Sequence, residues 1–270
     1  MQILGSNMVT SMKSSNIKHI FNTAFTGKTP HGDGFTSQEW YDKRADLFIK
    51  YTLESLKKQS NKEFLLWLTF RPQELLNPTT KKIAKALTAS GIANIMSFNG
   101  TMFTEDKAVW HNVDLKERLE VCLPTLKEFV GDADWVYETN LDSDDTVHKD
   151  FVKTVQSYKP KKKGALYMTR GFVYNTQGRV ADWLNPVSQQ NYTIMFPTKL
   201  YFDAEQRLEY LDGFNTHEQI PEKFKAEKLP DGLFCSIIHG GNISTVWSHP
   251  FRGNEYFYED EKQGIIKDFF

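Results

Sequence analysis

The chain has 270 residues, of which 40% are hydrophobic and 25% are charged, so it can bury a sizeable core and is not expected to be disordered. Its 33 basic and 34 acidic residues give a formal net charge of −1, which argues against a globally basic nucleic-acid-binding protein. Two cysteines are too few for a disulfide scaffold, and no apolar run approaches the ~18 residues of a membrane span. We therefore predict a cytoplasmic protein with no transmembrane segment and no nucleic-acid partner.

Short apolar runs alternate with amphipathic segments along the first half of the chain. Residues 1–16 lack the apolar stretch of a signal peptide and are expected to form a flexible tail. The spacing of apolar residues then predicts strands at 17–25, 64–70, 92–98 and 135–141, and helices at 38–58, 79–90, 114–130 and 148–158. Gly91 is well placed to end the second helix, and Pro124 is expected to kink the third or to begin a new one.

This order of elements predicts the fold class. Strands that alternate with helices pair in parallel and place helices on both faces of the sheet. We predict one α/β domain over residues 17–262, with a Rossmann-like, mostly parallel central sheet. Its first half, 17–145, is regular, whereas its second half, 146–262, is looser, and residues 263–270 are expected to be a C-terminal tail.

An acidic cluster follows the fourth predicted strand directly. Asp142, Asp144 and Asp145 lie within four positions, where their charges repel one another, so they are not expected to serve stability. In an open α/β sheet, the end of such a strand faces the crevice where ligands bind. An acidic cap for the next helix needs only one of the three. Because carboxylate oxygens suit hard divalent cations, the cluster predicts a metal site.

Three chemistries use acidic clusters of this kind. An EF-hand loop is excluded, because Val147 and Lys153 stand where that loop needs Gly and Glu. A haloacid-dehalogenase-like phosphatase would use Asp142 and Asp144, but three strand–helix units precede the motif here, whereas in that family it normally lies on the first strand. Sugar transfer from a nucleotide diphosphate is the third chemistry, in which a metal bridges the two phosphates.

The sequence resembles the glycosyltransferase A fold of family-2-like enzymes, and more closely the rhamnosyltransferase family of bacterial and viral proteins. The resemblance covers roughly residues 17–255. The matching pieces are Trp40-Tyr-x-x-Arg44, Thr52-Leu-x-Ser-Leu-x-x-Gln59 with Phe64 and Trp67, Thr139-Asn-Leu-Asp-Ser-Asp-Asp145, Arg170-Gly-Phe-Val-Tyr174, His217, and Ile238-His-Gly-Gly-Asn-Ile-Ser244.

The resemblance implies a role for each residue of the acidic cluster. Asp142 and Asp144 would form the Asp-x-Asp pair at Mn²⁺ or Mg²⁺ and the diphosphate, and His239 would complete the metal shell. Asp145 would support the pair or contact the donor ribose or sugar. Residues 17–145 would hold the nucleotide and residues 146–262 the acceptor.

Two further residues are predicted donor contacts. Asn22 lies in the first predicted strand. Arg71 follows the second strand, at the place where family-2 enzymes usually carry an aspartate that reads the nucleotide base. This departure leaves the identity of the donor open, and Arg71 is expected to contact the nucleotide or its phosphates.

An inverting transferase also needs a general base to take the proton of the acceptor hydroxyl. Asp212 and Glu218 flank the turn at 213–217 and are the candidates, with Asp231 behind them, whereas a retaining transferase requires no such base. We thus predict a metal-dependent transferase that moves rhamnose or another hexose from a nucleotide-diphosphate donor to a glycan or lipid-linked acceptor. The phosphatase and a catalytically inactive, carbohydrate-binding relative remain the alternatives.

Overall fold

The computed structural model describes residues 16–25, 37–98, 110–185, 187–188, 190–214, 216–242, 255–258 and 260–270. The predicted N-terminal tail therefore lies outside the described residues, apart from residue 16. None of the described helices combines the length and the apolar composition that a membrane crossing requires.

The regular alternation predicted for the first half is confirmed. The elements are β1 (Ile17–Ala24), α1 (Gln38–Leu47), a π-helical segment (Phe48–Thr52), α2 (Leu53–Lys57), β2 (Phe64–Thr69), a 3-10 helix (Pro72–Leu76), α3 (Pro78–Ser90), β3 (Asn94–Ser97), α4 (Trp110–Val130) and β4 (Trp135–Asn140).

Local signals explain where these helices begin and end. Ser37 accepts a hydrogen bond from the N–H of Trp40 at the start of α1, and Asn77 accepts one from the N–H of Thr79 at the start of α3. Gly91 ends α3 with φ 69°, a left-handed conformation that glycine adopts at little cost. Pro124 lies inside α4, which continues past it as one element, so a separate second helix does not form.

The second half contains more strands than the sequence indicated. Its elements are β5 (Asp145–Val147), α5 (Phe151–Ser157), β6 (Gly164–Tyr167), β7 (Arg170–Asn175), β8 (Val180–Leu184), β9 (Thr193–Pro197), α6 (Thr198–Tyr201), α7 (Ala204–Leu211), a 3-10 helix (His217–Gln219), α8 (Ile220–Lys223), β10 (Lys225–Lys228), β11 (Phe234–Ile238), β12 (Glu255–Tyr258) and a 3-10 helix (Asp260–Asp268).

The strands form two sheets within the described parts of the chain. The larger has seven strands in the order β10-β6-β9-β4-β1-β2-β3. The segment β4-β1-β2-β3 is parallel throughout, as predicted, whereas β9 runs antiparallel to both β4 and β6. The smaller sheet, in the order β12-β8-β7-β11-β5, was not predicted. Its strands are short and separated in sequence, so their pairing is not visible in local patterns.

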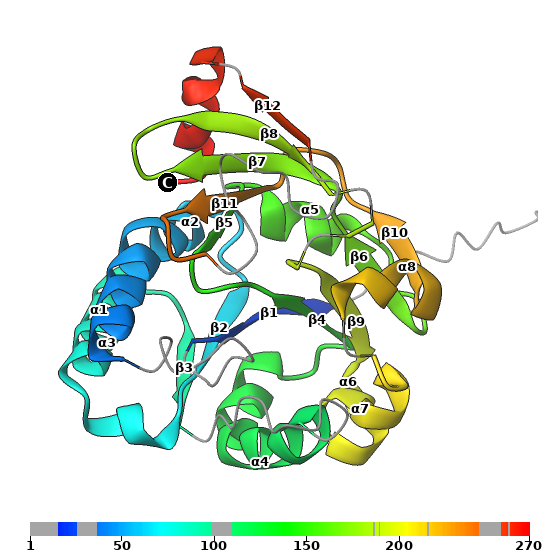
Figure 1. The fold of residues 1–270 in the computed structure, drawn as a ribbon. Coiled ribbons are helices and arrows are strands. Elements are labelled where there is room, and N and C mark those ends of the chain that lie inside the picture. Colours follow the sequence, from blue (N-terminus) through cyan, green and yellow to red (C-terminus); the bar gives the residue numbers. More distant parts are fainter. Residues whose placement is uncertain are drawn as a thin grey trace, which may run out of the picture.

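Helices cover both faces of the large sheet, as expected for this class (Figure 1). The adjacent residues Ile20 and Phe21 of β1 point to opposite faces and belong to different core clusters. The Ile20 face packs against α4, α6 and α7. The Phe21 face packs against α1, α2, α3 and α5, and the same cluster continues into the small sheet. The two sheets therefore share one core, and the chain passes between them at the end of β4.

The C-terminal residues 263–270, expected to be a tail, pack against the body of the protein. Ile266 and Phe269 are buried in a third cluster with Tyr51 and Ile237, and the Phe270 ring lies 4.8 Å from that of Tyr51. The segment packs against the protein because it carries apolar side chains, and burying each of them contributes roughly 1.5–3 kcal/mol to stability.

The contact between β7 and β11 leads to a test of the small sheet. A Cβ at Gly171 would lie 2.5 Å from the carbonyl oxygen of Phe234, so we predict that Gly171→Ala destabilises the protein by about 1–3 kcal/mol. Thermal unfolding measures the effect. The matched control is Gly264→Ala, whose added methyl group meets nothing within 4 Å. Equal melting temperatures for both variants would contradict the close approach of these strands.

Candidate functional site

The acidic cluster lies in the turn that connects the two sheets. The chain leaves β4 of the large sheet at Asn140 and enters β5 of the small sheet at Asp145. We call residues 142–145 the acidic turn. Because β1, β2 and β4 are parallel, their carboxyl ends lie along one edge, and the acidic turn occupies that edge.

Asp144 is held by partners from two distant segments. Antiparallel pairing places Ser236 of β11 opposite Asp145, and this register brings His239, just after β11, to the turn. The His239 Nε2 lies 2.9 Å from the Asp144 Oδ2, and the Nη1 of Arg44 in α1 forms an ion pair with the same oxygen. Burial alone raises the pKa of Asp144, but the charge of Arg44 and the hydrogen bond from His239 lower it to about 2. Asp144 is therefore firmly ionised.

Asp145 has amide partners instead of a cation. Its Oδ2 accepts hydrogen bonds of 2.9 Å from Gln190 Nε2 and Asn191 Nδ2, which lie between β8 and β9. Burial and the charges of Asp144 and Asp142 raise the pKa of Asp145 well above its ordinary value. The Asn191 amide also fixes the backbone, because its Oδ1 accepts from the N–H of Asp142 at 3.2 Å.

The ionised form of Asp142 is disfavoured in this structure. Burial and the neighbouring charge of Asp144 raise its pKa to about 6. No described lysine or arginine forms an ion pair with Asp142 or Asp145. The acidic turn thus combines one compensated carboxylate with two that a bound cation, or a ligand rich in hydroxyl groups, would stabilise.

One continuous helix holds the acidic turn from the side. The Thr52 hydroxyl donates a 3.1 Å hydrogen bond to the carbonyl of Ser143, while Arg44 reaches Asp144. These two residues are eight positions apart and would be separated by about 80° around a regular α-helix. The π-helical segment between them has a wider turn and brings both to the same side.

Arg44 and Thr52 are contacts that the sequence analysis did not assign. Both belong to the pieces that carry the family resemblance, which was the available signal. Neither the charge pattern nor the helical periodicity showed that they contact the acidic turn, because a regular helix would not align them.

The predicted metal set was Asp142, Asp144 and His239. The structure brings Asp144 and His239 into contact, but the described residues contain no group of three or more His, Cys, Asp or Glu side chains that could hold a metal ion. Arg44 also occupies the Oδ2 that such an ion would use. In this arrangement the Asp144 Oδ2 is not open to a cation, and metal dependence stays a prediction.

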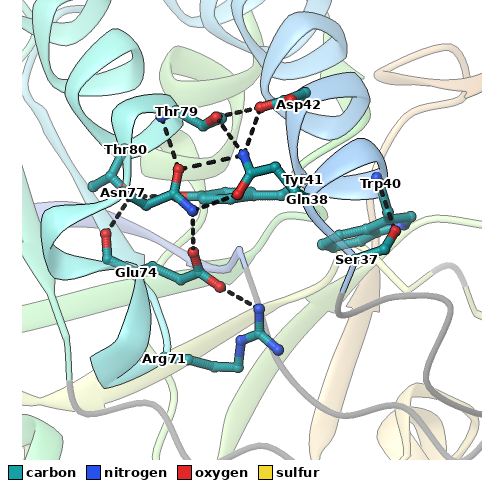
Figure 2. A network of polar contacts seen from close by, with 10 residues as sticks. All are labelled: Ser37, Gln38, Trp40, Tyr41, Asp42, Arg71, Glu74, Asn77, Thr79 and Thr80. Carbon is teal, nitrogen blue, oxygen red and sulfur yellow. Dashed lines mark hydrogen bonds and ion pairs between the residues drawn. The ribbon is translucent and has the colours of Figure 1, made fainter.

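The predicted donor contact Arg71 lies just beyond β2, at the same edge of the sheet. Its guanidinium forms an ion pair with Glu74, a buried residue of the following 3-10 helix. Glu74 in turn accepts a 3.1 Å hydrogen bond from Asn77, which caps α3. Figure 2 shows Arg71 at the end of this chain of contacts.

The same network joins the N-terminal ends of α1 and α3. Gln38 donates to Asp42 at 2.8 Å and to Thr79 at 3.0 Å, and the Tyr41 hydroxyl lies 2.6 Å from that of Thr80 (Figure 2). These contacts fix α1, and with it Arg44, relative to the segment that carries Arg71.

The other predicted donor contact, Asn22, points to a buried ion pair. Its amide donates to Glu138 Oε1 at 3.3 Å, and Glu138 also pairs with Arg207 and accepts a 2.6 Å hydrogen bond from the Tyr201 hydroxyl. The Asn22 side chain therefore contacts this ion pair, while its backbone carbonyl accepts from the N–H of Leu141 at 3.1 Å and anchors the start of the turn.

The two candidate bases lie in different surroundings. Asp212, at the end of α7, forms a 3.1 Å ion pair with Lys163, and its side chain is 70% exposed. The hydrogen bond and charge of Lys163 lower its pKa, which weakens it as a base. Glu218 is exposed in the 3-10 helix next to His217, whose Nδ1 lies 3.0 Å from the carbonyl of Ser188. That contact links this helix to the segment that carries Gln190 and Asn191.

The raised pKa of Asp142 leads to a stability prediction. Folding raises the pKa of Asp142 from 3.8 to about 6, so its ionised form destabilises the folded state at neutral pH. Asp142→Asn removes this charge and should raise the free energy of unfolding at neutral pH by about 1–3 kcal/mol. The gain should be absent below about pH 4, grow as the pH rises to about 6, and stay constant above. Urea unfolding across this range measures it, with Asp231→Asn, an exposed partner of Lys228, as the control. A less stable Asp142→Asn, or a gain independent of pH, would contradict the described charge balance.

The chain resembles known proteins in sequence and in structure. A search of curated proteins found no significant match. The crystal structure of S. aureus TarS 1-349 is 15% identical with a TM-score of 0.42, and the match covers 82% of this chain and 60% of that one. The inositol-1-phosphate CTP transferase from T. maritima is 12% identical with a TM-score of 0.35, over 94% of this chain and 97% of that one. The family model described as "Putative rhamnosyl transferase" matches residues 35–246, and since this is most of the chain, the protein belongs to that family of glycosyltransferases.

Proposed function

We propose that the protein transfers a sugar, rhamnose or another hexose, from a nucleotide-diphosphate donor to a hydroxyl of a glycan or lipid-linked acceptor. The observation that carries the proposal is the acidic turn, with its compensated Asp144, at the carboxyl edge of parallel strands in a member of this family. A cytoplasmic location stays a prediction.

The polar groups at this edge divide by charge. Arg71 and Arg44 supply guanidinium groups, which bind phosphate oxygens through paired N–H donors. Asp142 and Asp145 supply carboxylates that accept hydrogen bonds from ribose or sugar hydroxyls. In transfer, the bond between the sugar and the diphosphate breaks, and fixed positive groups stabilise the charge that develops on the departing nucleotide.

Among the two candidate bases, we favour Glu218. Asp212 is paired with Lys163 at the surface, whereas Glu218 adjoins His217 and the segment that contacts Asp145. An inverting transfer would use Glu218 to take the proton of the acceptor hydroxyl as the sugar bond forms.

The phosphatase alternative is less compatible with the charges of the turn. Hydrolysis of a phosphate ester with Asp142 as nucleophile would need Asp144 to donate a proton to the leaving group. Arg44 and His239 hold Asp144 ionised, with a pKa of about 2, so it is a poor proton donor at neutral pH. The structure does not distinguish the transferase from an inactive, carbohydrate-binding relative, but an assay of sugar transfer does.

Nucleotide release from UDP-, dTDP- and GDP-sugars, measured with and without glycan acceptors, tests the proposal. We predict turnover with one donor and a loss of about a hundredfold or more in Asp142→Asn. This variant is useful because it is expected to be more stable than the parent, so lost activity does not reflect unfolding. The matched control is Asp46→Asn, which changes an exposed carboxylate that pairs with Lys82. Hydrolysis of p-nitrophenyl phosphate that Asp142→Asn abolishes would favour the phosphatase. Glycan binding without any turnover would favour the inactive relative.

A further inference from the structure

Among the described lysines and arginines, Arg44 is the one that forms an ion pair with the acidic turn. Its guanidinium pairs with Asp144, and its Cζ lies 5.3 Å from the ring centroid of Trp40, one turn earlier in α1. Only 16% of the Arg44 side chain is exposed. Burial to this extent removes much of the hydration of an arginine side chain, which costs free energy. We therefore expect Arg44 to have a structural or functional role at the turn.

The contact with Asp144 competes with a metal ion. A divalent cation binds carboxylate oxygen at roughly 2.0–2.6 Å. The Asp144 Oδ2 already meets Arg44 Nη1 and His239 Nε2, the latter at 2.9 Å. A cation at this oxygen would displace the guanidinium and would also meet its positive charge at close range. Arg44 and a divalent ion therefore exclude each other at the Asp144 Oδ2.

The surrounding structure keeps Arg44 in place. The π-helical segment aligns it with Thr52, which binds the backbone of the turn at Ser143. Tyr41, one turn earlier on the same helix, is tied to Thr80 of α3 at 2.6 Å (Figure 2). The guanidinium is thus presented to the acidic turn by a helix that is fixed at both ends of the relevant stretch.

We propose that Arg44 is the internal cation of the donor site and takes the place of a divalent metal ion in binding the donor diphosphate. This inference rests on the proposed function. The contact with Asp144 uses Nη1, and the Nε of Arg44 is buried without a hydrogen-bond partner among the described residues, so the guanidinium keeps unused N–H donors that a bound phosphate would satisfy. The fixed charge then supplies the neutralisation that the departing nucleotide requires.

Isothermal titration of UDP, dTDP and GDP tests this, in excess EDTA and in manganese. The wild-type protein should bind one of these nucleotides equally well in both conditions. Arg44→Met should weaken binding in EDTA about tenfold or more, because a charged hydrogen-bonding group is lost. Manganese should restore part of that binding, since the Asp144 Oδ2 becomes available. Arg44→Lys keeps the charge without the paired N–H donors, so its nucleotide affinity in EDTA should lie between those of the wild type and Arg44→Met.

The control is Lys43→Met, which removes a neighbouring charge of α1 that pairs with exposed Glu39 and should leave binding unchanged. Wild-type binding that requires manganese and disappears in EDTA would overturn the inference while leaving the proposed function intact. This comparison needs no variant, so it holds even if Arg44→Met fails to fold. Absence of nucleotide binding in both conditions would instead remove the proposed function, and the inference with it.

Discussion

The compensation of one buried carboxylate organises the site. Three aspartates within four positions cannot all be ionised at low cost in a partly buried turn, and the charge of Arg44 together with the hydrogen bond from His239 stabilises Asp144. Those two partners lie 100 residues before Asp144 and 95 residues after it. Their meeting requires α1 and β11 to be positioned on either side of the turn.

Two devices supply that positioning. On one side, the π-helical segment turns Arg44 and Thr52 toward the same surface, and the polar network between α1 and α3 fixes the helix. On the other side, the short pair of β5 and β11 sets the register that delivers His239. Within the described part of the chain, Asp142 and Asp145 form no ion pair with a lysine or arginine, and burial together with the charge of Asp144 raises the pKa of both, so their ionised forms are disfavoured at this edge. Such destabilised groups are typical of binding and catalytic sites, where a ligand provides the missing stabilisation.

Sequence reasoning succeeded where structure is local. The spacing of apolar residues predicted β1, β2, β4 and the helices between them, and Gly91 marked the end of α3. It failed for the small sheet and for residues 263–270, since both depend on contacts between distant segments. For the site, it found the acidic turn and paired it with His239 through the family resemblance, but it assigned no role to Arg44. It also grouped Asp212 with Glu218, although the structure turns Asp212 toward Lys163.

The sequence by itself determined the α/β class, the parallel strands of the first half and the place of the acidic turn, because periodicity and caps act over a few residues. Only the tertiary structure decided what neutralises that turn. The pairing of β5 with β11 and the widened turn of the long helix arise from packing between remote segments, and they bring an arginine rather than an open set of metal ligands to Asp144.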